Sequence, residues 1–160
     1  LGWRFPKVVV YETGGGTGLI GMWKAFKELK SMGIVKGSLP RMVAAQSSGC
    51  APVVRGFQNL SSSTDFWKDS NTIALGLNVP GPIGGHWILD ILYQSNGLAL
   101  DIPEKELLTL TRDFNQITSM NSGAEGGVVW GAYSILKDIG WILPKESVVL
   151  FATGIERCKL

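Results

Sequence analysis

The chain has 160 residues, of which 45% are hydrophobic and 18% are charged, and its formal net charge is +2 at pH 7. This composition suffices for one hydrophobic core of ordinary size and lacks the charge excess of disordered or nucleic-acid-binding polypeptides, so one domain and no nucleic-acid partner are predicted. No apolar run reaches the length of a membrane span, and no charged leader with an apolar core opens the sequence, which predicts a cytoplasmic protein without a membrane partner.

Short apolar runs alternate with amphipathic segments along the chain. Four strands are predicted, at Lys7–Glu12, Met42–Gln46, Leu98–Ile102 and Ser147–Phe151. Five helices are predicted, at Thr17–Met32, Ala51–Asn59, Gly84–Gln94, Pro103–Phe114 and Ala124–Ile139. Three of the strands are dense in Val, Leu or Ile without clean polar alternation, which is typical of strands covered on both faces. We therefore expect an α/β fold with three αβα layers and a mostly parallel sheet.

A glycine-rich segment, Thr13–Gly18, joins the first predicted strand to the first predicted helix. Main chain without side chains can approach an anion closely, its N–H groups form a concave nest, and the following helix N-terminus adds roughly half a positive charge. The sequence therefore predicts a phosphorylated ligand held by main chain. The residues predicted to bind it are Gly14, Gly15, Gly16, Thr17 and Gly18, and Thr17 can add its hydroxyl.

Three other interpretations of this glycine pattern fit less well. The Walker loop requires a lysine where Met22 stands. The dinucleotide pattern GxGxxG is satisfied from Gly16 to Gly21, but the next predicted strand ends in Gln46 instead of the acid that binds the ribose hydroxyls of NAD. A turn that only lets the helix pack on the strand stays open, although so many glycines cost backbone entropy that packing alone does not require.

In its wider context, the same segment resembles a known family. The stretch from Val8 to Phe26, with TGGGTG at its centre, is similar to the phosphate loop and following helix of the threonine synthase and dehydratase family. Members of that family depend on pyridoxal phosphate (PLP) and have a tryptophan-synthase-beta-like fold. Segments 41–52, 72–80 and 147–154 resemble the family's next strand and turn, its central connecting segment, and its last strand with the loop that follows. These segments occur in the family's order and cover nearly the whole chain.

The resemblance implies a cofactor, a reaction and an assembly. It implies that PLP binds with its phosphate on the glycine-rich loop and its pyridine nitrogen facing the hydroxyl of Thr153, which tempers the ring as an electron sink. It implies a homodimeric threonine synthase, which converts the small amino-acid substrate O-phosphohomoserine and water to threonine and phosphate. Two alternatives stay open: a PLP-dependent serine or threonine dehydratase, and a non-catalytic α/β module that binds a nucleotide or phosphate.

Two places depart from the family's pattern. Glu12 stands where the family usually has proline, which places a carboxylate close to the expected phosphate. After Gly154 the family continues through small residues to a lysine, whereas residues 155–158 of this chain read IERC. The rear of the cofactor site is therefore expected to differ from the family's pattern.

The family's PLP-binding lysine lies on an upstream segment of the type Ser-Phe-Lys-Asp. This chain begins at Leu1 without a methionine, and only a few residues precede its first predicted strand. We therefore expect residues 1–160 to be the C-terminal half of a PLP-binding large domain, with no catalytic residue of its own. Lys68 lies in a similar Phe-Trp-Lys-Asp sequence, but it follows a serine run downstream of the glycine-rich loop and is not predicted to bind PLP.

Other reactive side chains have a structural explanation beside the functional one. Glu125, at the start of a predicted helix, could face the substrate, but an acid in the first turn also interacts favourably with the helix dipole. His86 lies on an apolar helix, where a packed or surface imidazole is expected instead of a general base. Cys50 and Cys158 lack metal-ligand spacing and are predicted to be reduced thiols, so no metal site is predicted.

Overall fold

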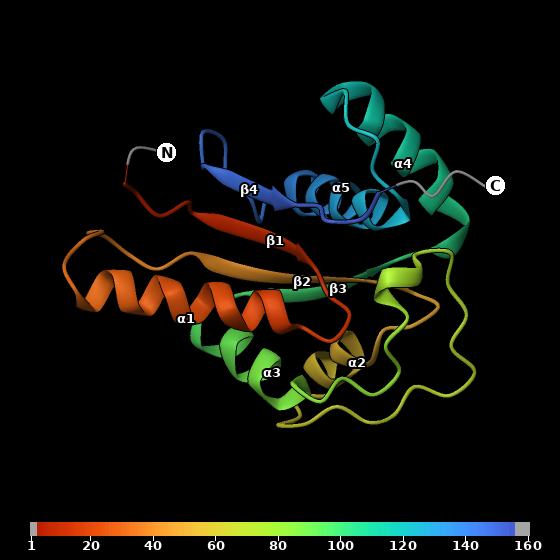
Figure 1. Ribbon diagram of the computed structural model, residues 1–160, viewed down its shortest axis with the longest axis horizontal. Coiled ribbons are helices and arrows are strands. Elements are labelled where there is room, and N and C mark those ends of the chain that lie inside the picture. The colour runs from red at the N-terminus through yellow and green to blue at the C-terminus, as the bar shows by residue number, and fades with distance from the viewer. Residues whose placement is uncertain (1–2, 156–160) are drawn as a thin grey trace.

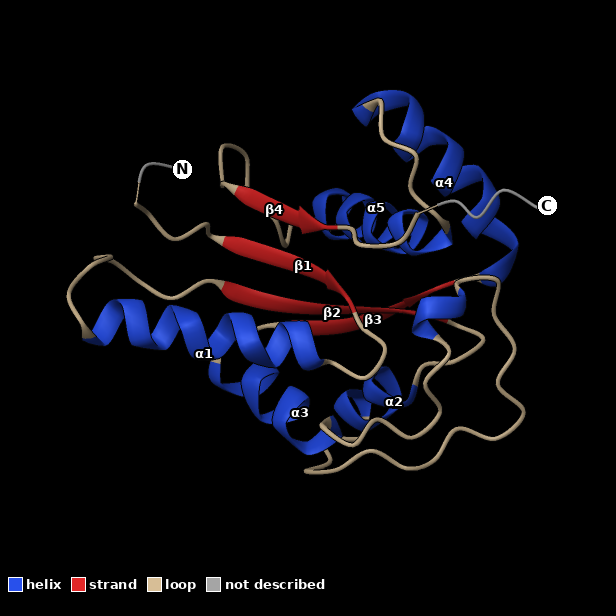
Figure 2. Cartoon of the chain, viewed as in Figure 1, coloured by secondary structure: helices blue, strands red, loops and turns tan. Residues whose placement is uncertain are grey.

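The computed structural model describes residues 3–155, which form a parallel sheet with helices on both faces (Figures 1 and 2). The strands are β1 (Val8–Glu12), β2 (Arg41–Ser47), β3 (Leu98–Ile102) and β4 (Val148–Phe151). The helices are α1 (Thr17–Ser31), α2 (Pro52–Gln58), α3 (Gly85–Gln94), α4 (Glu104–Thr118) and α5 (Ala124–Asp138), with a 3-10 turn η1 at Leu75–Leu77. The strand order is β3-β2-β1-β4, and every neighbouring pair is parallel. The predicted α/β fold is confirmed.

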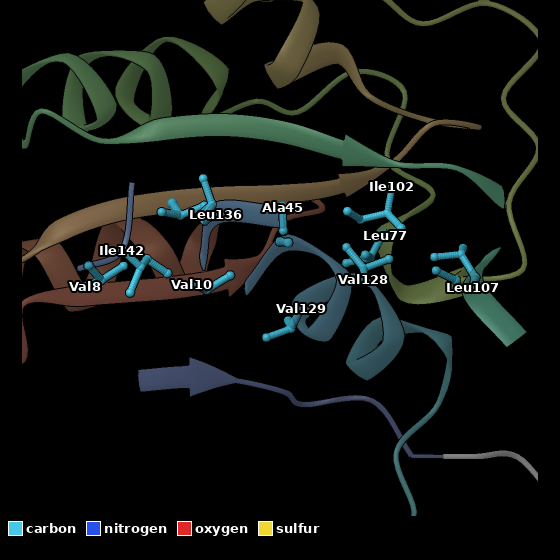
Figure 3. Close-up of a cluster of buried hydrophobic side chains, with 13 residues drawn as sticks. Val8, Val10, Ala45, Leu77, Ile102, Leu107, Val128, Val129, Leu136 and Ile142 are labelled. Carbon is cyan, nitrogen blue, oxygen red and sulfur yellow. The ribbon is translucent and has the colours of Figure 1, made fainter. Parts of the chain in front are cut away.

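The central strand β1 sends alternate side chains into two hydrophobic cores. Val8 and Val10 are fully buried in a core that includes Val129 of α5 (Figure 3). Val9 points to the other face, into a core that includes Leu19 of α1. Helices α1, α2 and α3 cover this second face, whereas α5, with α4 beside it, covers the first (Figure 2). Each buried valine or leucine contributes about 1.5–3 kcal/mol of transfer free energy, which explains why the strand has no polar alternation.

The register of the sheet brings two loops together. Tyr11 of β1 pairs with Phe151 of β4, and their rings stack with centroids 5.1 Å apart. Because the two strands are parallel, the loops that leave their carboxyl ends start side by side. Open α/β sheets bind ligands outside the carboxyl ends of their strands. The fold therefore points to this edge as the place for a site.

The predicted elements agree with the structure to within a few residues, with two differences. Helix α4 continues to Thr118, beyond its predicted end at Phe114, and stops at Ser119, which has a φ of +56°. The η1 turn lies in a segment for which no helix is predicted, and it forms because Leu77 is buried against the core on the α5 side. Among residues 3–155, no helix is long and apolar enough to cross a membrane.

Candidate cofactor site

A cleft of about 980 Å³ opens at the carboxyl ends of β1 and β4. The residues that line it are 11, 12, 14–18, 73, 75–77, 123–125 and 153–155, together with Leu108 and Thr111 of α4. These segments come from distant parts of the sequence, and the sheet and α5 hold them around one space. Clefts of about 300–1,000 Å³ are the size that binds small molecules and cofactors.

The glycine-rich loop presents main chain to this cleft. A Cβ atom at Gly14 would lie 2.8 Å from the carbonyl oxygen of Gly76. At Gly16, where φ is +79°, a Cβ atom would collide with the side chain of Ile88. A Cβ atom at Gly15, in contrast, would meet nothing within 4 Å. Packing therefore holds the loop on either side of Gly15, while Gly15 itself has open space beside it.

The first turn of α1 leaves its N–H groups free of a side-chain cap. The helix begins at Thr17, its N-cap residue is Gly16, and no side chain bonds to the first turn. No acidic residue lies in that turn either. The first N–H groups of a helix have no partner within the helix, and the helix dipole adds partial positive charge there. The combination of glycine-rich loop and uncapped helix suits a phosphate.

A buried hydrogen-bond network holds the start of the loop. The Thr13 N–H donates to the Ala45 carbonyl at 2.8 Å, and Gln46 Nε2 donates to the Thr13 carbonyl at 2.9 Å. Gln46 Oε1 accepts the N–H groups of Val53 at 2.9 Å and Val54 at 3.1 Å, at the start of α2. An unpaired buried amide would cost about 1–3 kcal/mol, so this network fixes where the loop leaves β1. Gln46 stands where a dinucleotide site would need an acid, and its function here is structural.

Glu12, the last residue of β1, joins the two loops. Its side chain is only 3% exposed, and its Oε1 accepts the backbone N–H of Thr153 at 2.5 Å and also the Thr153 hydroxyl. Burial raises the pKa of Glu12, the hydrogen bonds from Thr153 partly offset that rise, and the neighbouring Glu125 adds to it. Glu12 is the carboxylate that the sequence places close to the expected phosphate, and its Oε1 is hydrogen-bonded to Thr153.

Glu125, in the first turn of α5, supports another wall of the cleft. Its Oε1 accepts the N–H of Gly76 in the η1 turn at 2.8 Å. A Cβ atom at Gly76 would lie 3.0 Å from the same oxygen, so a side chain there would displace the carboxylate by a few tenths of an ångström. Glu125 has a structural function in the chain as described, although its carboxylate also lines the cleft.

The structure brings the sequence-predicted cofactor residues to this one cleft, and their contact with a cofactor stays a prediction. These residues are Gly14, Gly15, Gly16, Thr17, Gly18 and Thr153. Lys68 and His86 are exposed and do not line the cleft, so neither is placed to act there. Cys50 is a buried free thiol, and Cys158 lies outside the described residues.

Two features of the site were not predicted from the sequence. One is the η1 wall: segment 72–80 resembles the family's central connecting segment, but the resemblance assigned no site residue to it. The other is the bond between Glu12 and Thr153. Glu12 was visible as a departure from the family's pattern, but the direction of its side chain was not.

The residues present fit PLP. The open main chain at Gly15 and the uncapped start of α1 offer N–H donors to a phosphate, and Thr153 offers a polar partner on the β4 side of the cleft. A parallel α/β sheet with an open glycine-rich loop and an uncapped helix start at its carboxyl edge is an arrangement that suits a phosphorylated cofactor. The sequence model of the family "Pyridoxal-phosphate dependent enzyme" matches residues 1–154, and the chain belongs to this family. Its cofactor is PLP.

The curated proteins that this chain resembles include threonine synthases. Threonine synthase from Methanocaldococcus jannaschii is 30% identical to this chain, in an alignment that covers 96% of the chain and 38% of the relative. The chain thus spans about two-fifths of the length of the curated relatives it matches.

Solved structures of other enzymes have the same fold as this chain. An L-serine ammonia-lyase from Rhizomucor miehei superposes with a TM-score of 0.73 at 17% identity, covering 94% of this chain and 46% of that one. Threonine synthase from Escherichia coli superposes with a TM-score of 0.64 at 17% identity, covering 93% of this chain and 32% of that one. The fold is that of the tryptophan-synthase-beta-like PLP enzymes.

Proposed function

We propose that the full-length protein is a PLP-dependent threonine synthase, which converts O-phosphohomoserine and water to threonine and phosphate. The observation that carries this proposal is the similarity, along nearly the whole chain, to relatives named threonine synthase. Because the chain spans only part of those relatives, residues 1–160 are proposed to be the C-terminal half of a PLP-binding large domain. The PLP-binding lysine is then supplied by an upstream segment of the full-length protein.

In this proposal the chain supplies the phosphate cradle. When bound, PLP withdraws electrons from the carbon atoms of an attached amino acid, which allows protons and a leaving group to depart. The main-chain N–H groups of residues 14–18 hold the cofactor's phosphate, and Thr17 can add its hydroxyl. The loop's anchors at Thr13 and Gln46 keep these donors in position before the cofactor binds.

Thr153 is proposed to bind the ring nitrogen of the cofactor with its hydroxyl. It lies in the cleft, immediately after β4, and its backbone and hydroxyl are both held by Glu12. A hydroxyl at this position favours elimination and replacement at the outer carbons of the amino acid over transamination. The family resemblance supports extending the proposal to a homodimer located in the cytoplasm.

A dehydratase is the second candidate, because the Rhizomucor miehei L-serine ammonia-lyase has the same fold along this chain. A non-catalytic phosphate-binding module is the third, because no catalytic side chain is identified among residues 3–155. One assay separates them. Given O-phosphohomoserine, the full-length protein is expected to release threonine and phosphate in equal amounts, while serine and threonine yield oxoacid much more slowly.

The products decide between the candidates. Rapid formation of oxoacid and ammonia from serine or threonine, with no phosphate released from O-phosphohomoserine, would establish the dehydratase. Turnover of none of these substrates by protein that carries PLP would support the non-catalytic module.

A further inference from the structure

The end of β1 carries a tyrosine on the face of the sheet that α1 covers. Tyr11 packs against the same hydrophobic core as Val9, two residues earlier in the strand. Its ring stacks on that of Phe151 in β4, with centroids 5.1 Å apart and an angle of 25° between the planes. Such aromatic pairs contribute about 0.5–1.5 kcal/mol beyond their buried area. The stack therefore restricts the direction in which the Tyr11 hydroxyl points.

The hydroxyl end of Tyr11 lies against the first turn of α1. A Cβ atom at Gly18 would lie 2.7 Å from Cζ of Tyr11 and would collide with its hydroxyl oxygen. Gly18 is helical and its φ is not positive, so its backbone conformation does not require glycine. A glycine within a helix costs up to about 1 kcal/mol relative to alanine. Gly18 therefore makes room for the Tyr11 hydroxyl beside the main chain of this turn.

The Tyr11 hydroxyl is a hydrogen-bond donor that a ligand can use. Burial raises the pKa of Tyr11, and the neighbouring Glu12 raises it further, so the hydroxyl keeps its proton at neutral pH. Within residues 3–155 this hydroxyl has no hydrogen-bond partner, and the side chain is only partly buried. Tyr11 lines the cleft together with Gly15 and Gly18 of the glycine-rich loop. A side-chain donor thus lies next to the main-chain donors.

A phosphate in this part of the cleft has only neutral donors. Among the described residues that line the cleft, the charged side chains are Glu12 and Glu125, and none is Lys, Arg or His. A hydrogen bond to a charged group contributes about 1.5–3 kcal/mol, more than a bond between neutral groups. One additional hydroxyl donor therefore has a measurable effect on the affinity for a phosphate.

We propose that the Tyr11 hydroxyl donates a hydrogen bond to the phosphate of PLP, beside the main-chain N–H groups of the glycine-rich loop. The inference rests on the proposed position of that phosphate on the loop. It adds a side chain from the strand before the loop to the donors of residues 14–18. The proposed substrate, O-phosphohomoserine, also carries a phosphate, and the experiment separates the two.

The test compares two ligands that differ only in the phosphate. Full-length apoprotein is titrated with PLP and with pyridoxal, in wild type and in Tyr11→Phe. Phenylalanine keeps the ring that stacks on Phe151 and removes only the hydroxyl. We expect the Kd for PLP to rise about 10-fold or more and the Kd for pyridoxal to stay the same. The phosphorus NMR resonance of bound PLP should also shift between wild type and the variant.

Tyr93→Phe is the matched control. Tyr93 of α3 also stacks on a phenylalanine, Phe57, but its hydroxyl donates to the Ser61 carbonyl and does not line the cleft. Its Kd for PLP and its phosphorus resonance should equal those of wild type. Thermal unfolding of each apoprotein checks folding. Tyr11→Leu, which also lacks a hydroxyl, replaces Tyr11→Phe if that variant does not fold.

The two ligands and the substrate give distinct outcomes. Equal affinities for PLP in wild type and Tyr11→Phe would overturn the inference. An equal loss of affinity for PLP and pyridoxal would also overturn it, because the hydroxyl would then act on the ring or on the fold. An unchanged Kd for PLP with a raised KM for O-phosphohomoserine would assign the hydroxyl to the substrate's phosphate instead. Absence of threonine formation, with the expected Kd values, would reject the proposed function and support this inference.

Discussion

The two loops that meet at the cleft are built in opposite ways. The glycine-rich loop excludes side chains, since a Cβ atom at Gly14 or Gly16 would run into neighbouring residues. The loop after β4 depends on side chains, because Glu12 holds Thr153 from a position 141 residues away in the sequence. The shape of the glycine-rich loop thus depends on the absence of side chains. The shape of the loop after β4 depends on a hydrogen bond between two residues that are distant in the sequence.

This difference predicts different responses to substitution. In the glycine-rich loop, the effect of an added side chain depends on whether the backbone faces open space or packed atoms. In the Glu12–Thr153 pair, the effect depends on charge and hydrogen-bond capacity at nearly constant shape. Three substitutions examine this contrast.

Gly15→Asp is expected to have the largest effect, and on cofactor binding instead of folding. The new side chain has room, because a Cβ atom at Gly15 meets nothing within 4 Å, but its charge opposes the phosphate. Two unit charges about 4 Å apart near a protein surface interact by about 4 kcal/mol, so the Kd for PLP is expected to rise about 100-fold or more. Equilibrium titration of the full-length apoprotein with PLP measures this change.

Gly21→Asp is the matched control for Gly15→Asp. Gly21 lies on the exposed side of α1, does not line the cleft, and also has open space for a Cβ atom. Its Kd for PLP should stay close to that of wild type. Unchanged PLP affinity in Gly15→Asp would show that the phosphate does not bind at this loop.

Gly16→Ala is expected to act on folding, with a loss of about 2 kcal/mol in the free energy of unfolding. The residue has a φ of +79°, and its new methyl group would collide with Ile88 of α3. Denaturant unfolding of the full-length apoprotein measures the loss. Gly21→Ala, at an ordinary helical position, should instead stabilise the protein by up to about 1 kcal/mol. Equal stability of Gly16→Ala and wild type would mean that the loop is not held as described.

Glu12→Gln is expected to have the smallest effect, one that depends on pH. The pKa of Glu12 is raised above its ordinary value of 4.5, so its contribution to stability is complete below pH 4.5 and declines as pH rises toward the raised pKa. Glutamine does not titrate, and the stability of the variant relative to wild type should therefore increase with pH over that window. The change is modest because the bonds from Thr153 partly offset the burial of the charge.

Unfolding of the full-length apoprotein at several pH values measures this difference. Glu28→Gln is a suitable control, since Glu28 lies on the exposed surface of α1 in a pair with Lys24. A stability difference between Glu12→Gln and wild type that did not change with pH would contradict the burial of an ionisable Glu12.

The amino-acid sequence determined the succession of strands and helices and the position of the glycine-rich loop. Both are local properties. The apolar run from Val8 to Val10 marks a strand covered on both faces, and the periodicity from Thr17 onward marks a helix. Gly14, Gly15 and Gly16 mark a main-chain loop because glycine is the residue that leaves backbone accessible.

The family resemblance implied that the glycine-rich loop and Thr153 share one cofactor site, but the tertiary structure alone decided which strands pair and which side chains meet there. The sequence does not show that β4 pairs with β1, and it is this pairing that sets Thr153 beside Glu12. Nor does it show that Glu125 holds Gly76 to form a wall of the cleft. The physical reason is that strand order and side-chain direction follow from packing between distant segments, whereas periodicity and glycine content are set by near neighbours in the chain.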